Sequence, residues 1–108
     1  MATISKDNKV VTLINVFTIE PENQQKLAEL LIEATEKGMR HIQGFVSASI
    51  HRSFDGTKVV NYAQWRSLED FEAMRQNPEA RPHMDAAAAL AAYTPILCEV
   101  IDSFSADD

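Results

Sequence analysis

Asn61, Trp65 and Asn15 are the residues whose types and positions could carry chemistry. Each lies in a run of strand-forming residues, KVVNYAQW for the first two and VVTLINVFT for the third. Side chains alternate across a strand, so Asn61 and Trp65 share one face. An amide can donate a hydrogen bond to a developing oxyanion, and tryptophan offers a flat ring with an indole N–H. An amide buried without partners costs about 1 to 3 kcal/mol, so each asparagine on an apolar face requires a structural partner or a ligand.

A hairpin within the stretch GFVSASIHRSFDGTKVVNYAQW positions two of these residues. The pair Asp55-Gly56 separates predicted strands at about 45–53 and 58–66 and favours a two-residue type I′ turn. That turn would pair Phe54 with Thr57, Arg52 with Val59, Ile50 with Asn61, Ala48 with Ala63 and Val46 with Trp65. One face would then carry Val46, Ala48, Ile50, Val59, Asn61, Ala63 and Trp65. Because Ala48 and Ala63 are small, this face has room for a cavity.

The remaining elements follow from apolar spacing and from prolines. Residues 10–18 read as a strand with Val11, Leu13, Asn15 and Phe17 on one face. Pro21 opens a helix to about Met39, whose core face is Leu27, Leu30, Leu31, Ala34 and Gly38. Ser67 and Asp70 form a capping box for a helix that buries Leu68, Phe71 and Met74. A second helical piece from Pro82 to Tyr93 turns Met84, Ala88 and Leu90 or Ala91 inward, and the last strand, ILCEVIDSF, follows Pro95.

This order predicts an α+β fold of the ferredoxin-like type, β-α-β-β-α-β, with an antiparallel four-stranded sheet and the helices on one face. We expect one domain over 1–108, with an ordered core at about 10–104. The first and third strands are central neighbours in this plan, so Asn15 and Asn61 should lie side by side under the helices. Arg81 and His83, on the proline-broken helix, could supply positive charge or a base at the mouth of the cavity.

The helix-free face of the sheet is expected to be apolar and to pack against a second copy of the chain. Its predicted apolar members are Ile14, Val16, Phe45, Val60, Tyr62, Leu97 and Ile101. Such a stripe is too hydrophobic to stand in water as one patch. A homodimer formed sheet to sheet is the predicted assembly.

Composition narrows the function. The formal charge is -6 and the basic residues are scattered, so nucleic acid is not an expected partner. His41 and His51 lack metal-ligand spacing, and the single Cys98 reads as a small buried hydrophobe rather than a catalytic thiol. No apolar run has the length of a signal core or a membrane span, so the expected location is the cytoplasm.

The motifs NYAQW, SLEDF and NPEARPHM, in this order, resemble the antibiotic biosynthesis monooxygenase family of dimeric α/β barrels. The resemblance covers about 10–104 and implies a dimeric α/β barrel. Polyketide oxygenases of this family use an asparagine and a tryptophan on the third strand, spaced as Asn61 and Trp65 are, which implies a catalytic role for both. The family also includes haem-degrading enzymes, a signal-molecule isomerase and members of unknown role.

The predicted function is a cofactor-independent monooxygenase that oxidises a small aromatic or enolic substrate, polyketide-like or quinol-like, with O2. In this hypothesis Asn61 and Trp65 are catalytic, and Asn15, Arg81 and His83 bind the substrate. Haem degradation is the alternative within the family, since Asn15 and His83 roughly match its residues, although Met74 stands where a tryptophan is expected. A non-catalytic dimeric ligand-binding or stress module is the alternative from another class. Purely structural roles stay open for Asn61 with Trp65 and for Asn15, and a solvated or helix-capping role for His83.

Overall fold

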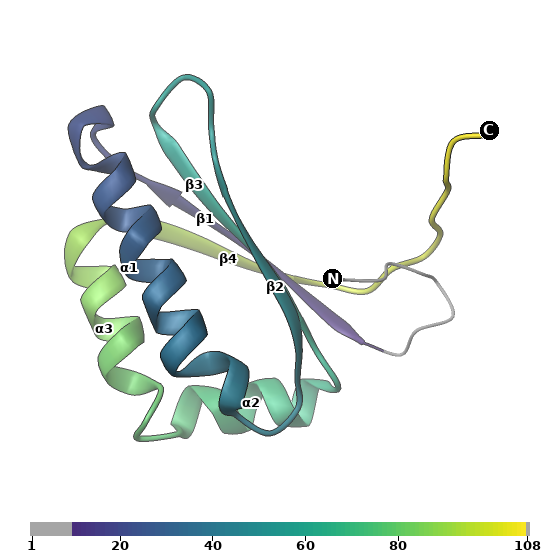
Figure 1. Ribbon diagram of the computed structural model, residues 1–108. Coiled ribbons are helices and arrows are strands. Elements are labelled where there is room, and N and C mark those ends of the chain that lie inside the picture. The colour runs from purple at the N-terminus through teal and green to yellow at the C-terminus, as the bar shows by residue number, and fades with distance from the viewer. Residues whose placement is uncertain (1–9, 108) are drawn as a thin grey trace.

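The structure, a computed structural model, describes residues 10–107. Within this range the elements are β1 (Val11–Thr18), a 3-10 turn (Pro21–Asn23), α1 (Gln24–Lys37), a second 3-10 turn (Met39–His41), β2 (Phe45–Arg52), β3 (Lys58–Trp65), α2 (Leu68–Gln76), α3 (Arg81–Leu90) and β4 (Ala92–Cys98). The strands of the described chain form one antiparallel sheet in the order β2-β3-β1-β4. All the helices lie on one side of this sheet (Figure 1). The predicted ferredoxin-like fold is therefore confirmed.

The central pair of strands, β1 and β3, has the register that matters for function. Asn15 lies directly opposite Asn61, with Leu13 opposite Ala63 on one side and Phe17 opposite Val59 on the other. Because all these positions are an even number of residues apart, their side chains share one face. The predicted juxtaposition of Asn15 and Asn61 on adjacent strands is confirmed.

The hairpin turn differs from the predicted type I′ turn. Among the described residues positive φ outside glycine does not occur, whereas type I′ would require it at Asp55 as well as at Gly56. The Gly56 N–H instead donates to Ser53 O at 3.2 Å, and the Ser53 N–H donates to Lys58 O at 3.0 Å. The loop is therefore longer by one residue on each side. That symmetric extension leaves the predicted pairing of Arg52, Ile50 and Ala48 with the third strand unchanged.

The predicted pairing of Val46 with Trp65 is wrong, because β2 contains a bulge. Phe45 lies opposite Trp65 and Ser47 opposite Gln64, so Val46 is the extra residue. The bulge turns Val46 outward, where it is 47% exposed. It also brings Phe45 to the helix side, where its ring meets Trp65 edge-on with centroids 5.5 Å apart. Phe45 is thus removed from the predicted open face.

The helices follow the predicted apolar periodicity with two corrections. α1 buries Leu27, Ala28, Leu31 and Ala34. α2 buries Phe71 and Met74, but Leu68, at its first position, is 53% exposed. In α3, which begins at Arg81, one residue before the predicted start, the buried position is Ala87 rather than Ala88. No helix among the described residues is long and apolar enough to cross a membrane. The cytoplasmic location stays a prediction.

β4 begins earlier and ends earlier than predicted. Pro95 lies inside the strand, which runs from Ala92 to Cys98. A proline is tolerated there because β4 is an edge strand and one of its sides makes no ladder hydrogen bonds. Leu97 pairs with Leu13 and so faces the helices, while Ile101 lies beyond the strand and is 83% exposed. The predicted open-face members Leu97 and Ile101 are therefore wrong. Ile96, which lies opposite Ile14, is the apolar residue that β4 contributes to the open face.

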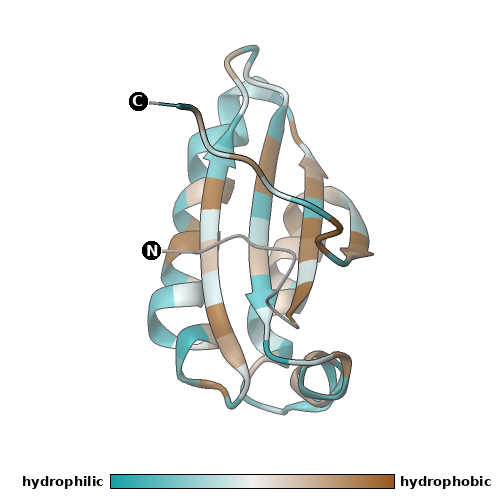
Figure 2. Cartoon of the chain, turned by 90° about the vertical axis from the view of Figure 1, so that its right-hand side faces the viewer, coloured by the Kyte–Doolittle hydropathy of each residue, from teal (hydrophilic) through white to brown (hydrophobic). Residues whose placement is uncertain are grey.

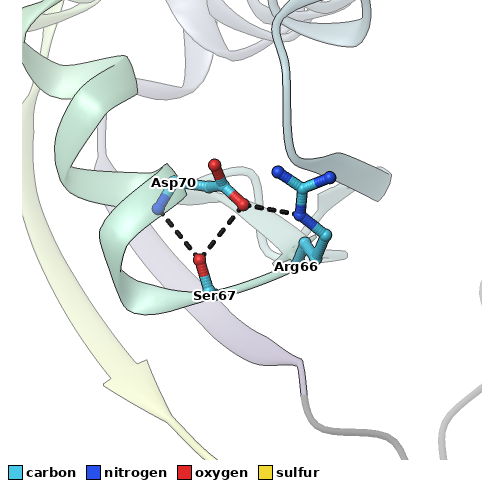
Figure 3. Close-up of polar contacts among 3 residues, drawn as sticks. All are labelled: Arg66, Ser67 and Asp70. Atoms are coloured by element: carbon cyan, nitrogen blue, oxygen red, sulfur yellow. Dashed lines mark hydrogen bonds and ion pairs between the residues drawn. The ribbon is translucent and has the colours of Figure 1, made fainter.

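A polar cluster joins the end of β3 to the start of α2 (Figure 3). Ser67 Oγ accepts a hydrogen bond from the Asp70 N–H at 3.0 Å, which is the predicted helix cap, and donates one to Asp70 Oδ2 at 3.1 Å. Arg66 Nε donates to the same oxygen at 2.8 Å, and this bond holds the pKa of Asp70 below its ordinary value. Gly44, at φ +89°, packs so closely that a Cβ there would collide with Asp70. The cluster therefore fixes where α2 begins over the sheet.

Loss of this cap should lower stability measurably. We expect Ser67→Ala to reduce the free energy of unfolding by about 1 kcal/mol, the usual cost of deleting a helix cap. Gly44→Ala should cost more, since it combines a collision with an unfavourable positive φ. Urea denaturation measures both, with Ser105→Ala in the exposed C-terminal segment as the control. An unchanged midpoint for both variants would contradict the role assigned to the cluster.

Asp55 makes the hairpin turn sensitive to acid. Its carboxylate accepts bonds from the Thr57 N–H, the Ser53 hydroxyl and the Thr57 hydroxyl, and these lower the Asp55 pKa from 3.8 to about 2. A lowered pKa stabilises the fold fully above the ordinary value, and this contribution is lost as the pH falls toward 2. Asp55→Asn should therefore lower Tm at pH 7 by more than at pH 2. An equal difference in Tm at both pH values would contradict this expectation.

Candidate active site

Two core clusters meet at the asparagine pair. One cluster contains Phe17, Leu27, Leu31, Val59 and Ala87, and the other contains Leu13, Ala63, Trp65, Phe71, Met74 and Ala80. Along β1 and β3, Asn15 and Asn61 occupy the positions between them. We call this pair the asparagine seam. It interrupts what would otherwise be a continuous apolar layer beneath the helices.

The seam contains unsatisfied hydrogen-bonding capacity. Asn15 Oδ1 and Asn61 Oδ1 are both buried and have no hydrogen-bond partner among residues 10–107. Side chains directly opposite each other on antiparallel strands have Cβ atoms about 5 Å apart, so one small group can reach both amides. A buried carbonyl oxygen without a donor costs about 1 to 3 kcal/mol. The seam is thus a place where a polar ligand atom or a water would gain hydrogen bonds without displacing existing ones.

A cavity of about 320 Å³ lies beside the seam, between the sheet and the helices. Apolar and aromatic side chains dominate its wall, together with Asn15, Thr35, Arg75 and His83. The lining residues are Leu13, Asn15, Phe17, Leu31, Ala34, Thr35, Met39, Phe71, Met74, Arg75, His83, Met84, Ala87, Tyr93, Pro95 and Leu97. Thioether side chains adapt to irregular shapes, and aromatic rings favour stacked or edge-on contacts. The cavity therefore suits a flat, largely apolar molecule that has a few polar substituents.

His83 lies where α3 approaches the end of α1. A Cβ added at Gly38 would lie 2.8 Å from His83 Nε2 and 2.9 Å from His83 Cδ2. The same Cβ would lie 2.9 Å from the backbone oxygen of Ala34, so the glycine leaves room for both the imidazole and the end of α1. This glycine directly follows α1, which ends at Lys37. The sequence predicted Gly38 as a core-face residue, and its role in the structure is to admit the His83 ring to the cavity wall.

The structure places only some of the predicted site residues in the cavity wall. Asn15 and His83 line it, whereas Asn61, Trp65 and Arg81 are not among its lining residues. Asn61 lies next to Asn15 across the strands. Trp65 is 2% exposed and packs behind Phe71, with ring centroids 6.4 Å apart. Arg81 is exposed at the first position of α3. The catalytic roles of Asn61 and Trp65 and the binding roles of Asn15, Arg81 and His83 stay predictions.

Sequence reasoning missed Arg75 and Tyr93 as cavity residues. Arg75 follows the buried Met74 in the last turn of α2, and the Tyr93 ring packs against Phe17 at an interplanar angle of 37° with centroids 5.7 Å apart. Helical periodicity identifies the buried residue of a turn but does not tell which neighbour borders a cavity. The predicted strand boundary at Pro95 had placed Tyr93 in a helix. Among the described residues no three His, Cys, Asp or Glu side chains come together in a possible metal site.

Comparison with known proteins assigns this chain to a family. The chain belongs to the antibiotic biosynthesis monooxygenase family, whose model matches residues 10–89. The family predicted from the three sequence motifs is therefore confirmed.

Three relatives are similar over nearly their whole lengths. Tetracenomycin-F1 monooxygenase of Streptomyces glaucescens is 50% identical over 106 residues, which are 98% of this chain and 95% of that protein. A monooxygenase from the gene ActVA-Orf6 of Streptomyces coelicolor, solved in complex with nanaomycin D, is 26% identical with a TM-score of 0.83, over 93% of this chain and 95% of that one. SnoaB of Streptomyces nogalater, described as a cofactor-independent oxygenase, is 25% identical with a TM-score of 0.64, over 93% of this chain and 95% of that one.

Proposed function

We propose that this chain is a cofactor-independent monooxygenase that oxidises an aromatic polyketide in the cavity beside the asparagine seam. The observation that carries the proposal is the pair of buried, unpartnered amide oxygens next to an apolar cavity. The identity to tetracenomycin-F1 monooxygenase supports the substrate class, and the likeness to SnoaB supports the independence from cofactors.

The chemistry needs little from the protein beyond binding and charge stabilisation. An electron-rich phenol or enol, once deprotonated, can reduce O2 itself and form a carbon–oxygen bond to it. Loss of water from the resulting hydroperoxide leaves a carbonyl, so one oxygen atom enters the substrate and the other leaves as water. If the side-chain amide of Asn61 flips, its NH2 group can donate a hydrogen bond to the oxyanion that develops on the substrate. Preorganised donors stabilise such an oxyanion strongly. Asn15 would hold the same oxygen from the facing strand, and the Trp65 ring supports Phe71 against the substrate plane.

The haem-degrading alternative is not favoured. The relatives reported above are a tetracenomycin-F1 monooxygenase and oxygenases of the same fold. A non-catalytic binding module is likewise less consistent with a relative of 50% identity that is a monooxygenase.

Oxygen uptake tests the proposal. Purified protein, stripped of metals with a chelator and free of flavin absorbance, should consume O2 when tetracenomycin F1 is added. With 18O2 the product should gain one labelled oxygen atom, and water should receive the other. Uptake that requires an added metal, flavin or haem would overturn the cofactor-independent assignment, and binding without any uptake would favour the non-catalytic alternative.

We also propose that the chain acts as a homodimer formed through the helix-free face of the sheet. Viewed from this side, the strands carry hydrophobic segments and no described helix covers them (Figure 2). The register places Ile14, Val16, Val60, Tyr62 and Ile96 there. A stable interface of this kind buries on the order of 2,000 Å² in total.

Light scattering should therefore give twice the chain mass of 12.1 kDa at micromolar concentration. Ile96→Asp, on the open face, should shift the measured mass toward that of the monomer, whereas Ile32→Asp should leave it unchanged. Ile32 is 48% exposed on α1, and Ile96 is 47% exposed, so the two changes are matched. A monomeric parent protein, or equal effects of the two variants, would contradict the proposed assembly.

A further inference from the structure

The charge of the cavity wall is opposite to the charge of the chain. The chain has 16 acidic and 10 basic residues, yet the described residues that line the cavity include Arg75 and His83 and no aspartate or glutamate. This arrangement disfavours a cationic ligand and favours one with a negative charge.

The ion pair that Arg75 makes is exposed, which leaves its guanidinium easy to recruit by a bound anion. Its Nη1 lies 3.2 Å from Glu72 Oε2 and 3.5 Å from Glu72 Oε1, within one turn of α2. The two side chains are 54% and 48% exposed. An ion pair this exposed contributes little to stability, so the guanidinium can leave Glu72 for a better partner at little cost. Arg75 therefore differs from Arg66, whose guanidinium is held by the largely buried carboxylate of Asp70 in the helix cap.

We propose that Arg75 binds a carboxylate substituent of the aromatic substrate at the mouth of the cavity. A guanidinium presents parallel N–H donors that match the two oxygens of a carboxylate, which makes it selective for a planar anion. The inference rests on the proposed function, because it assumes that the aromatic substrate occupies this cavity. Arg75 enters the wall from α2 and Asn15 from β1, so the two polar groups contact the ligand from different elements. Arg75 would then determine which substrates bind and how they are oriented in the cavity. The asparagine seam would hydrogen-bond the substrate oxygen on which negative charge develops.

Binding of two matched aromatic probes tests this. We would titrate 3-hydroxy-2-naphthoate and its neutral amide, 3-hydroxy-2-naphthamide, into the full chain by calorimetry. Arg75→Gln should weaken binding of the carboxylate about tenfold, as loss of a charge-assisted pair does, and change binding of the amide less than twofold. Glu72→Gln should tighten binding of the carboxylate, since it removes the anion that competes for Arg75. Arg75→Lys should recover part of the loss.

Arg52→Gln is the control for net charge. Arg52 lies at the hairpin end of β2, bonds to Gln25 and is not among the lining residues of the cavity. The Arg52→Gln variant should keep the parent affinity for both probes. Equal losses in Arg75→Gln and Arg52→Gln, or equal losses for the two probes in Arg75→Gln, would overturn the inference.

The outcomes also separate this inference from the proposed function. If the amide binds and O2 is consumed but Arg75→Gln does not discriminate between the probes, only the carboxylate assignment fails. If the discrimination is observed but tetracenomycin F1 produces no O2 uptake, the anion site stands and the oxygenase proposal fails. If neither probe binds the parent protein while tetracenomycin F1 still drives O2 uptake, the anion site fails and the oxygenase proposal stands.

Discussion

Asn61→Ala is expected to lower kcat/KM by about 10- to 100-fold, which corresponds to about 1.4 to 2.7 kcal/mol of transition-state stabilisation. The physical reason is the position of Asn61 in the asparagine seam, where its amide can donate a hydrogen bond to the negative charge that develops on the substrate oxygen. Its effect on folding should be small. The variant removes a buried oxygen that has no partner, so the lost packing is offset by a lost desolvation penalty. Initial rates of O2 uptake and a urea denaturation curve measure the two effects separately.

Asn23→Ala is the matched control for this variant. Asn23 is an amide at the start of α1 whose side chain makes no capping hydrogen bond, and it lies outside the cavity lining. It should leave both turnover and the denaturation midpoint nearly unchanged. If Asn61→Ala instead lowered the midpoint sharply and left turnover as in the parent, Asn61 would be a structural residue and the site assignment would fail.

Ala87→Leu is expected to weaken binding of aromatic ligands at least tenfold. Ala87 is 4% exposed, belongs to the core cluster near the hairpin and lines the cavity. A leucine there would fill part of the 320 Å³ that the ligand needs. Because the added atoms enter existing space, we expect the free energy of unfolding to change by less than the 1 to 3 kcal/mol that overpacking of a filled core costs. Calorimetric titration with 3-hydroxy-2-naphthamide measures the affinity.

Ala88→Leu controls for the added side chain on the same helix. Ala88 is exposed on α3, so the larger residue should extend into solvent without changing the affinity. Unchanged affinity in Ala87→Leu, with an intact fold, would mean that aromatic ligands bind elsewhere and would remove the cavity from the proposed mechanism.

The asparagine seam gives a physical reason for the position of the cavity. Leucine or isoleucine at positions 15 and 61 would join the two core clusters and bury more apolar area, which would stabilise the fold. The chain instead has two amides there with buried, unpartnered oxygens. Functional sites commonly retain such locally unfavourable residues, because preorganised polar groups act on a ligand without further rearrangement.

The sequence by itself determined the features that depend on local periodicity. Alternation along two strands placed Asn15 and Asn61 on one face, and their pairing across β1 and β3 followed from the order of elements. The cap of α2 followed from the spacing of Ser67 and Asp70. The register of most of the hairpin survived an incorrect turn type, because the loop is extended equally on both strands. These features arise between residues close in sequence or from the two-residue period of a strand, so the pattern alone contains them.

Tertiary structure decided which side chains border the cavity. The bulge at Val46 brought Phe45 opposite Trp65 and removed Val46 from the predicted pairing, and the alternation of residues along β2 does not mark it. Arg75 rather than Arg81 reached the cavity wall, because the direction of α2 and α3 over the sheet depends on the volumes of side chains from distant segments. Gly38 and His83 are likewise 45 positions apart in the sequence, and only the approach of α3 to the end of α1 brings them together. Packing between elements is a property of all their side chains at once, and periodicity within one element does not contain it.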